Sequence, residues 1–194
     1  MKIYFHLDFE TLTNCYLVVN EKEKKALIID PCKISNTIIS QIENERYTLC
    51  GVLITHKHEN HYRGLKTLQK IYNFPVYAAD NELASTYGVL KGDGFKEIAG
   101  LNIDYFSVPG HSSDSIVYKI GNLLFTGDVL FAGTIGSSSC AFTKHNLCNG
   151  IKTKLFTMSD DTIIMPGHGP MSSVGAEKLF NLDIIEEDKK SSGN

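Results

Sequence analysis

Four short apolar runs each end in a turn of small residues that carries a metal-binding side chain, and this repeated arrangement constrains the fold more than any other feature. The four turns read THKHENH at 55–61, PGHSSD at 109–114, TGD at 126–128 and PGHG at 166–169. The branched and aromatic residues before them are typical of β-strands. If these strands end at one rim of a sheet pair, the four turns meet in a single cleft.

The remaining pattern predicts an α/β fold. Strand-like runs at 14–19 and 26–29 are followed by isoleucines at helical spacing between 34 and 42. A second helix is expected over 64–72, and the stretch 95–133 reads as successive strands, VLFAG at 129–133 among them. Helices return in the last third of the chain. Two mixed sheets packed face to face with helices on the outer faces are the simplest layered solution. We expect one domain over 1–187 and a flexible tail over 188–194.

Composition excludes several classes of function. The formal charge is −3 and lysines and arginines form no patch, so we expect no nucleic-acid partner. No apolar run approaches the roughly 20 residues that cross a bilayer, and the polar N-terminus is not typical of a secretion signal. We therefore expect a cytoplasmic protein with a small-molecule substrate and no membrane contact. The five cysteines form no CxxC pair and are expected to be mostly reduced and structural.

The crowded histidines indicate a metal site. Side chains at i and i+2 of extended backbone point the same way, so His56 and His58 can bind one ion together, while His61 faces elsewhere. A catalytic zinc ion takes three protein ligands and keeps one position for water, so a further ligand must come from a distant turn. His111, Asp128 and His168 are the available side chains. His6 and His145 are isolated, and isolated histidines are usually solvated or hydrogen-bonded, so neither is expected to bind metal.

The motifs THKHENH, PGHSSD, LLFTGDVLFAGTIG and MPGHGP, in this order, resemble those of the metallo-beta-lactamase superfamily, and most closely its compact glyoxalase II-like members. The resemblance covers nearly the whole chain. It implies an αββα sandwich with a metal site at the sheet edge. It also implies a ligand set for two metals: His56, His58 and His111 for the first, Asn60, His61 and His168 for the second, and Asp128 bridging them.

Asn60 departs from the family's pattern, which has aspartate at this position. An amide oxygen is a weak, neutral ligand, whereas a carboxylate offsets the charge of the ion and can orient a bound water. We expect the second metal to bind more weakly by roughly tenfold or more. Glu59 could substitute only if it turned from the opposite face of an extended segment. The cofactor is therefore expected to be one or two Zn²⁺ ions, with iron as an alternative, and Asp128 and Asn60 are the residues expected to act on the bound water.

A second departure concerns the substrate. Glyoxalase II-like relatives usually carry an Arg-Thr-Asp stretch where this chain has Ser137, Ser138 and Ser139. The fixed cation and carboxylate of that loop are lost, so recognition of glutathione is in doubt. Full-length glyoxalase II also has a C-terminal helical domain that contributes to glutathione recognition, and the residues after His168 include no such domain.

Three functions are compatible with these motifs. The first is a metallo-hydrolase that acts on a thioester, ester or lactone carbonyl. The second is an iron-dependent persulfide dioxygenase, because His56, His111 and Asp128 match the two-histidine, one-carboxylate site of those family members. The third is a degenerate metal-binding module without catalysis, which the Asn60 substitution and the serine run favour and the other six ligand positions oppose. Beta-lactam hydrolysis is disfavoured because a secreted resistance enzyme carries an export signal.

Overall fold

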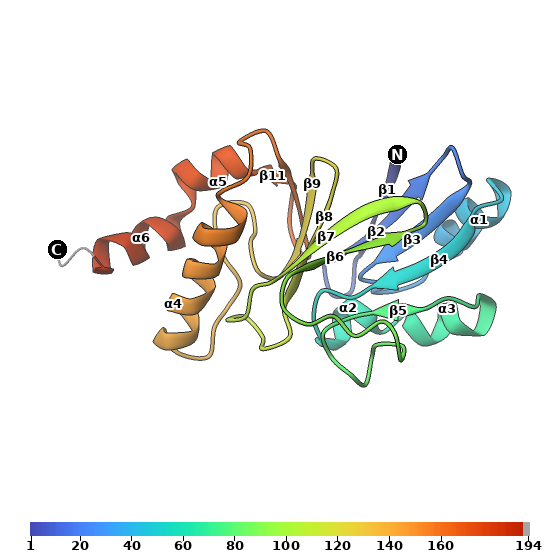
Figure 1. The fold of residues 1–194 in the computed structure, drawn as a ribbon, viewed down its shortest axis with the longest axis horizontal. Helices are drawn as coiled ribbons and strands as arrows, with labels where there is room; N and C mark the ends of the chain where they lie inside the picture. The colour runs from blue at the N-terminus through green and yellow to red at the C-terminus, as the bar shows by residue number, and fades with distance from the viewer. Residues whose placement is uncertain (192–194) are drawn as a thin grey trace.

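The computed structural model describes residues 1–191 and contains two β-sheets packed face to face (Figure 1). The first sheet has the strand order β1-β2-β3-β4-β5 and the second β11-β10-β9-β8-β7-β6. Both sheets are mixed, since each combines antiparallel hairpins with parallel neighbours. The predicted α/β sandwich of two mixed sheets is confirmed.

The first sheet is built from the N-terminal part of the chain. Its hairpin of β1 and β2 pairs antiparallel, whereas β4 lies parallel to both of its neighbours, β3 and β5. A parallel connection needs a crossover, and helices supply it here. The strands are β1 (Lys2–Asp8), β2 (Thr13–Asn20), β3 (Lys25–Ile29), β4 (Thr48–Leu53) and β5 (Val76–Tyr77).

The second sheet follows from residue 94 onward. Its strands β6 to β9 form an antiparallel meander, and β10 then lies parallel to β9. The strands are β6 (Gly94–Ile98), β7 (Leu101–Ser107), β8 (Ile116–Ile120), β9 (Leu123–Gly127), β10 (Ile163–Pro166) and β11 (Ser172–Ser173).

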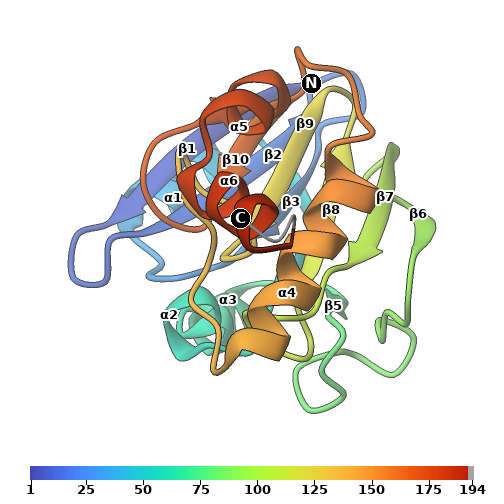
Figure 2. The same ribbon diagram turned by 90° about the vertical axis from the view of Figure 1, so that its left-hand side faces the viewer.

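Helices cover the outer face of each sheet and bury three apolar layers. Figure 1 shows α1 and α3 beside the first sheet, and Figure 2 shows α4, α5 and α6 in front of the second. Alternate residues of a strand point to opposite faces, so β2 gives Leu17 to the outer layer and Val18 to the layer between the sheets. The helices are α1 (Asn36–Asn44), α2 (Glu59–Tyr62), α3 (Leu65–Ile71), α4 (Ala141–Gly150) with a π-helical continuation (Ile151–Leu155), α5 (Val174–Phe180) and α6 (Leu182–Ser191).

The two sheets are joined at one rim. Thr13, at the start of β2, forms an isolated antiparallel bridge with His168, which follows β10. The neighbouring Asn14 donates its backbone N–H to the Gly167 carbonyl at 2.7 Å and its side-chain Nδ2 to the carbonyls of Pro166 and Gly169. This junction fixes the PGHG turn against the other sheet.

Three details differ from the expectations. The strand β1 was not predicted, although it pairs with β2 over its whole length. The predicted strand at 129–133 is wrong: this segment forms turns with a single bridge between Leu130 and Ile135, because the chain must leave the sheet after Asp128 to present that side chain. Helix α6 extends over 188–191 of the expected tail, and 192–194 lie outside the described residues.

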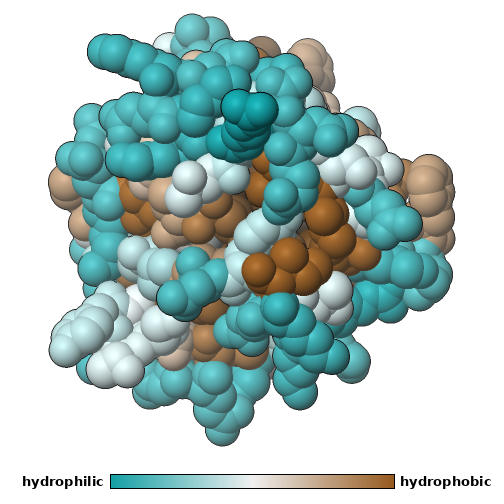
Figure 3. All heavy atoms as spheres, turned by 90° about the vertical axis from the view of Figure 1, so that its right-hand side faces the viewer, coloured by the Kyte–Doolittle hydropathy of each residue, from teal (hydrophilic) through white to brown (hydrophobic). Residues whose placement is uncertain are grey.

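One end of the molecule has a largely polar surface (Figure 3). Figure 3 looks at the end of the molecule where α1 and α3 lie, and hydrophilic residues surround a central apolar area there. Among residues 1–191 no helix has the length and apolar character needed to cross a bilayer.

Candidate metal centre

The strand ends bring the predicted turns together at the rim where the sheets join. His56 and His58 follow β4, and His111 follows β7. Asp128 directly follows β9, and His168 follows the parallel strand β10 after Gly167. His61 lies in the short helix α2, which begins after His58. All six predicted histidine and aspartate side chains therefore come to one place from five elements.

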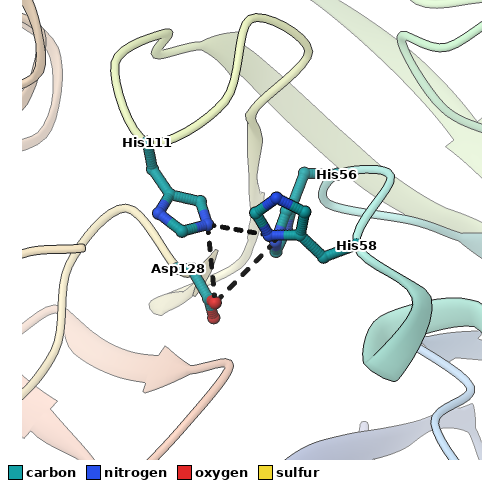
Figure 4. A group of neighbouring side chains, drawn as sticks. All are labelled: His56, His58, His111 and Asp128. Atoms are coloured by element: carbon teal, nitrogen blue, oxygen red, sulfur yellow. Dashed lines mark hydrogen bonds and ion pairs between the residues drawn. The ribbon is translucent and has the colours of Figure 1, made fainter. Parts of the chain in front are cut away.

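Four of these side chains converge on one point. The Nδ1 of His58 lies 2.9 Å from the Nε2 of His56 and 3.0 Å from the Nε2 of His111. The Asp128 Oδ2 lies 3.8 Å from the first Nε2 and 3.6 Å from the second. One ligand atom from each of the four residues falls within 4.8 Å of the others. Figure 4 shows the rings and the carboxylate turned toward a common centre.

Hydrogen bonds fix which ring nitrogens face this centre. The His111 Nδ1 donates to the Ser137 carbonyl at 2.9 Å, so its Nε2 carries the lone pair. Thr55 donates its hydroxyl to Asp30 at 2.7 Å and so accepts from the His56 Nδ1 at 3.0 Å. The His56 Nε2 is therefore also unprotonated. The His58 Nδ1 lies within hydrogen-bond distance of both nitrogens, so three ring nitrogens and the Asp128 carboxylate face one centre, which is the arrangement of a metal ligand set.

A second group shares Asp128. The His61 Nε2 lies 3.3 Å from Asp128 Oδ1, and the His168 Nε2 lies 3.7 Å from Asp128 Oδ2. These three ligand atoms again fall within 4.8 Å of one another. Asp30 accepts a hydrogen bond from the His61 Nδ1 at 2.8 Å, so it orients this ring directly.

Two buried atoms of the centre fit a metal ion. The His61 Nε2 and the Asp128 Oδ1 are buried 3.3 Å apart, and neither has another hydrogen-bond partner. A buried polar atom without a partner costs about 1–3 kcal/mol, so such atoms need another role. Histidine nitrogen and carboxylate oxygen are ligands for Zn²⁺ and for non-haem iron. The residues present therefore fit a divalent metal.

The charges of the buried groups differ sharply. Burial, reinforced by the neighbouring histidines, lowers the pKa of His56 to about 2. Burial also lowers the pKa of His61, but the carboxylates of Asp30 and Asp128 outweigh it and raise the pKa to about 10. Burial raises the pKa of Asp128, while the hydrogen bond and charge of His61 bring it down to about 2. The first group therefore holds a neutral imidazole at physiological pH and the second a protonated one.

Position 60 does not match its expected role. Asn60 lies in α2 with its Nδ2, and not its oxygen, 3.1 Å from the His168 Nε2. Glu59 starts this helix, and its exposed side chain lines a surface recess with Arg63 and Lys66. The expected extended backbone at this point is wrong, because residues 59–62 turn into a helix.

Sequence reasoning missed the residues that orient the ligands. Asp30 anchors His61 directly and His56 through Thr55. Asp114 accepts the Lys57 N–H at 2.8 Å and so holds the histidine-rich turn against the PGHSSD turn. The only available signal is position, since Asp30 also directly follows a buried strand.

The glycine of the PGHG turn allows the close packing of the centre. A Cβ at Gly167 would lie 2.4 Å from the Asp128 Oδ1 and 2.7 Å from the His61 ring, so only glycine fits there without movement. The two histidines left out of the site lie elsewhere: the His6 ring pairs with Gln41 and the His145 ring with Glu187.

Comparisons with known proteins agree with this geometry. The family model of the metallo-beta-lactamase superfamily matches residues 9–106 and 106–168. The hydroxyacylglutathione hydrolase GloC of Haemophilus influenzae is 30% identical over 87% of this chain and 91% of its own, and the probable metallo-hydrolase YqgX of Bacillus subtilis is 29% identical over 87% and 90%.

Solved structures share the whole architecture. The BLEG-1 B3 metallo-beta-lactamase superposes with a TM-score of 0.84 at 25% identity, covering 94% of this chain and 99% of its own. ETHE1 from Myxococcus xanthus superposes with a TM-score of 0.82 at 25% identity, covering 100% and 92%. Since the matched motifs are those whose histidines and aspartate meet at the rim, the chain belongs to the metallo-beta-lactamase superfamily.

Proposed function

We propose that the protein is a metal-dependent hydrolase of thioesters, and of related ester or lactone carbonyls, with a small molecule as substrate. The observation that carries the proposal is the convergence of His56, His58, His111 and Asp128 on one point. When bound there, a divalent ion supplies a Lewis acid and a water whose pKa is lowered to about 7. The similarity to hydroxyacylglutathione hydrolases favours a thioester among the possible carbonyl substrates.

The chain's own residues would hold and orient this centre. His56, His58 and His111 present their ring nitrogens as ligands, with two of the rings locked by Thr55 and Ser137. Asp128 stays ionised, because its pKa is about 2, and so is available to accept a hydrogen bond or a proton beside the reacting carbonyl.

Two surface recesses lie near the centre and are available to a substrate. The first, about 330 Å³, lies on the His111 side and is lined by Ser137, Ser138 and Lys144 among others. The second, about 420 Å³, lies on the His168 side and is largely apolar, with Phe5, Leu7 and Leu12 in its wall. Lys144 is held by Asp183 at 2.7 Å, so its charge is already paired. The first recess therefore lacks a free fixed cation, in line with the loss of the Arg-Thr-Asp stretch.

Thiol release from a panel of hydroxyacylglutathione, simple thioester and lactone substrates tests the proposal. We expect turnover by zinc-loaded protein, loss of turnover with a chelator, and a loss of more than about 100-fold in His111→Ala. His145→Ala is the matched control, because this histidine lies outside the centre, and it should keep full activity. Turnover that survives both the chelator and His111→Ala would contradict the proposal.

An iron-dependent oxygenase is the second candidate. His56, His111 and Asp128 form the two-histidine, one-carboxylate set that suits Fe(II) oxygen chemistry, and the fold resembles that of ETHE1 from Myxococcus xanthus. Oxygen uptake by iron-loaded protein with glutathione persulfide, in the absence of thioester turnover, would favour this function over hydrolysis.

A further inference from the structure

A continuous line of polar contacts runs from the first strand to the second metal group. The Thr11 hydroxyl donates to Asp8 Oδ2 at 2.8 Å, and it lies 2.8 Å from the Thr13 hydroxyl. The Thr13 oxygen lies 3.1 Å from Asn60 Nδ2, which in turn lies 3.1 Å from the His168 Nε2. Asp8 is only 5% exposed and Thr13 is fully buried, whereas Thr11, Asn60 and His168 are partly exposed, so bulk water is kept from the two buried residues.

The contacts can be satisfied in only one direction. A carboxylate accepts and never donates, and Asp8 also accepts from Arg63 at 2.5 Å. The Thr11 hydroxyl donates its single hydrogen to Asp8, so in its contact with Thr13 it must accept, and the Thr13 hydroxyl must donate. Thr13 then has no hydrogen left and can only accept from Asn60. A flipped amide would place two acceptors, the Asn60 Oδ1 and the Thr13 Oγ1, against each other.

The other end of the line requires the same orientation. The His168 Nδ1 lies 2.8 Å from the Leu12 carbonyl, so it donates there and leaves the Nε2 as an acceptor. The Asn60 Nδ2 supplies the second hydrogen that this acceptor needs. The lone pair with which His168 would bind a metal is therefore already engaged, and the amide oxygen, the only atom of Asn60 that could bind metal, faces away from His168.

We propose that Asp8, Thr11 and Thr13 are positioning residues that orient the Asn60 side chain so that its amide nitrogen faces His168. This orientation restricts the protein to one metal ion, which would be bound by His56, His58, His111 and Asp128. Only the His61 Nε2 and the shared Asp128 remain for a second ion. This explanation for a single metal ion rests on the orientation of the Asn60 amide and is independent of the missing negative charge at position 60. It concerns the number of metals and stands whether or not the reaction is hydrolysis.

Metal titration of the full chain tests the proposal. Metal-free protein is equilibrated with zinc, and bound zinc is measured by elemental analysis. We expect one tightly bound zinc in the wild type and two in Asn60→Asp, where a carboxylate oxygen replaces the amide nitrogen beside His168. Thr11→Val removes the acceptor of the Thr13 hydroxyl, which can then donate to a flipped Asn60 oxygen. This variant should bind the second zinc about tenfold more tightly than the wild type, the scale of an outer-shell partner.

The control variant is Thr67→Val, which changes an exposed threonine of α3 and should leave both affinities unchanged. First-site affinity, which should equal that of the wild type, verifies that each variant is folded. Two equally tight zinc ions in the wild type, or a second-site affinity in Thr11→Val no different from that in Thr67→Val, would overturn the proposal.

A direct measurement needs no variant. In metal-free wild type, nitrogen-15 NMR should show His168 as the Nδ1-protonated tautomer, with the Asn60 side-chain hydrogens close to its ring. An Nε2-protonated His168 would be incompatible with the inferred direction of the contacts, because Asn60 would then need its oxygen there.

Discussion

The two metal groups share Asp128 but are prepared for metal in opposite ways. On the His56, His58 and His111 side, the ring nitrogens turn toward one another and toward Asp128. On the other side, the His168 lone pair accepts from Asn60, and the pKa of His61 is raised to about 10. Histidine and aspartate residues at matching positions are therefore not enough for a metal site, because their hydrogen-bond partners decide whether a lone pair is available.

Asp30 accounts for much of this contrast. It accepts directly from His61 and so favours the protonated ring, whereas Thr55 stands between it and His56. A hydroxyl passes on the orientation of the carboxylate without passing on its full charge. One buried carboxylate thus holds both rings in place and leaves them in different protonation states.

The largest expected effect is the difference in zinc affinity and activity between two substitutions, one of Asp128, which both groups share, and one of His168 in the second group. Asp128→Asn should weaken zinc binding and lower activity by more than about 100-fold, because a ligand contributes more than the 10–100-fold of an outer partner. His168→Ala should change first-site affinity by less than about threefold. Chelator competition measures both. An equal loss of first-site zinc affinity in the two variants would show that the two groups act as one site.

A smaller effect is expected from substitution of Asp30, which orients both His61 and His56. Asp30→Asn keeps the shape but weakens the acceptor for Thr55 and His61, so zinc affinity should fall by about 10–100-fold. Asp104→Asn, on β7 and about half exposed, is the control and should leave affinity unchanged. A wild-type affinity in Asp30→Asn would mean that packing alone orients the rings.

The smallest effect is the pH dependence of stability in metal-free protein. The pKa of His56 is about 2 in the folded chain and 6.5 unfolded, so its contribution is lost as the pH falls below 6.5. The pKa of His61 is raised to about 10, so its contribution is present below 6.5 and is lost as the pH rises toward 10. The melting temperature with a chelator present should therefore be highest near pH 6.5. Asp30→Asn should flatten the alkaline decline, and an unchanged decline would assign it to other groups.

The convergence of the candidate ligands was predictable from sequence, but their hydrogen-bond partners were not. Each turn that carries a candidate ligand follows an apolar strand, and that local pattern predicted both the sandwich and the convergence of His56, His111 and Asp128. The contacts of Asn60 with Thr13 and His168 span 47 and 108 residues. No local periodicity reports such contacts, so the expectation at this position rested on charge alone. The strand β1 was missed for a related reason, since its half-exposed residues show no clear alternation.

The bridge between Thr13 and His168 joins the turn after β10 in one sheet to the start of β2 in the other, and Thr13 also contacts Asn60. The two layers therefore cannot slide or separate at this edge without disturbing the metal centre. The sandwich and its chemistry should be lost together on heating, and the Asn14 amide, which donates across the same seam, should exchange its hydrogen only when the whole domain opens.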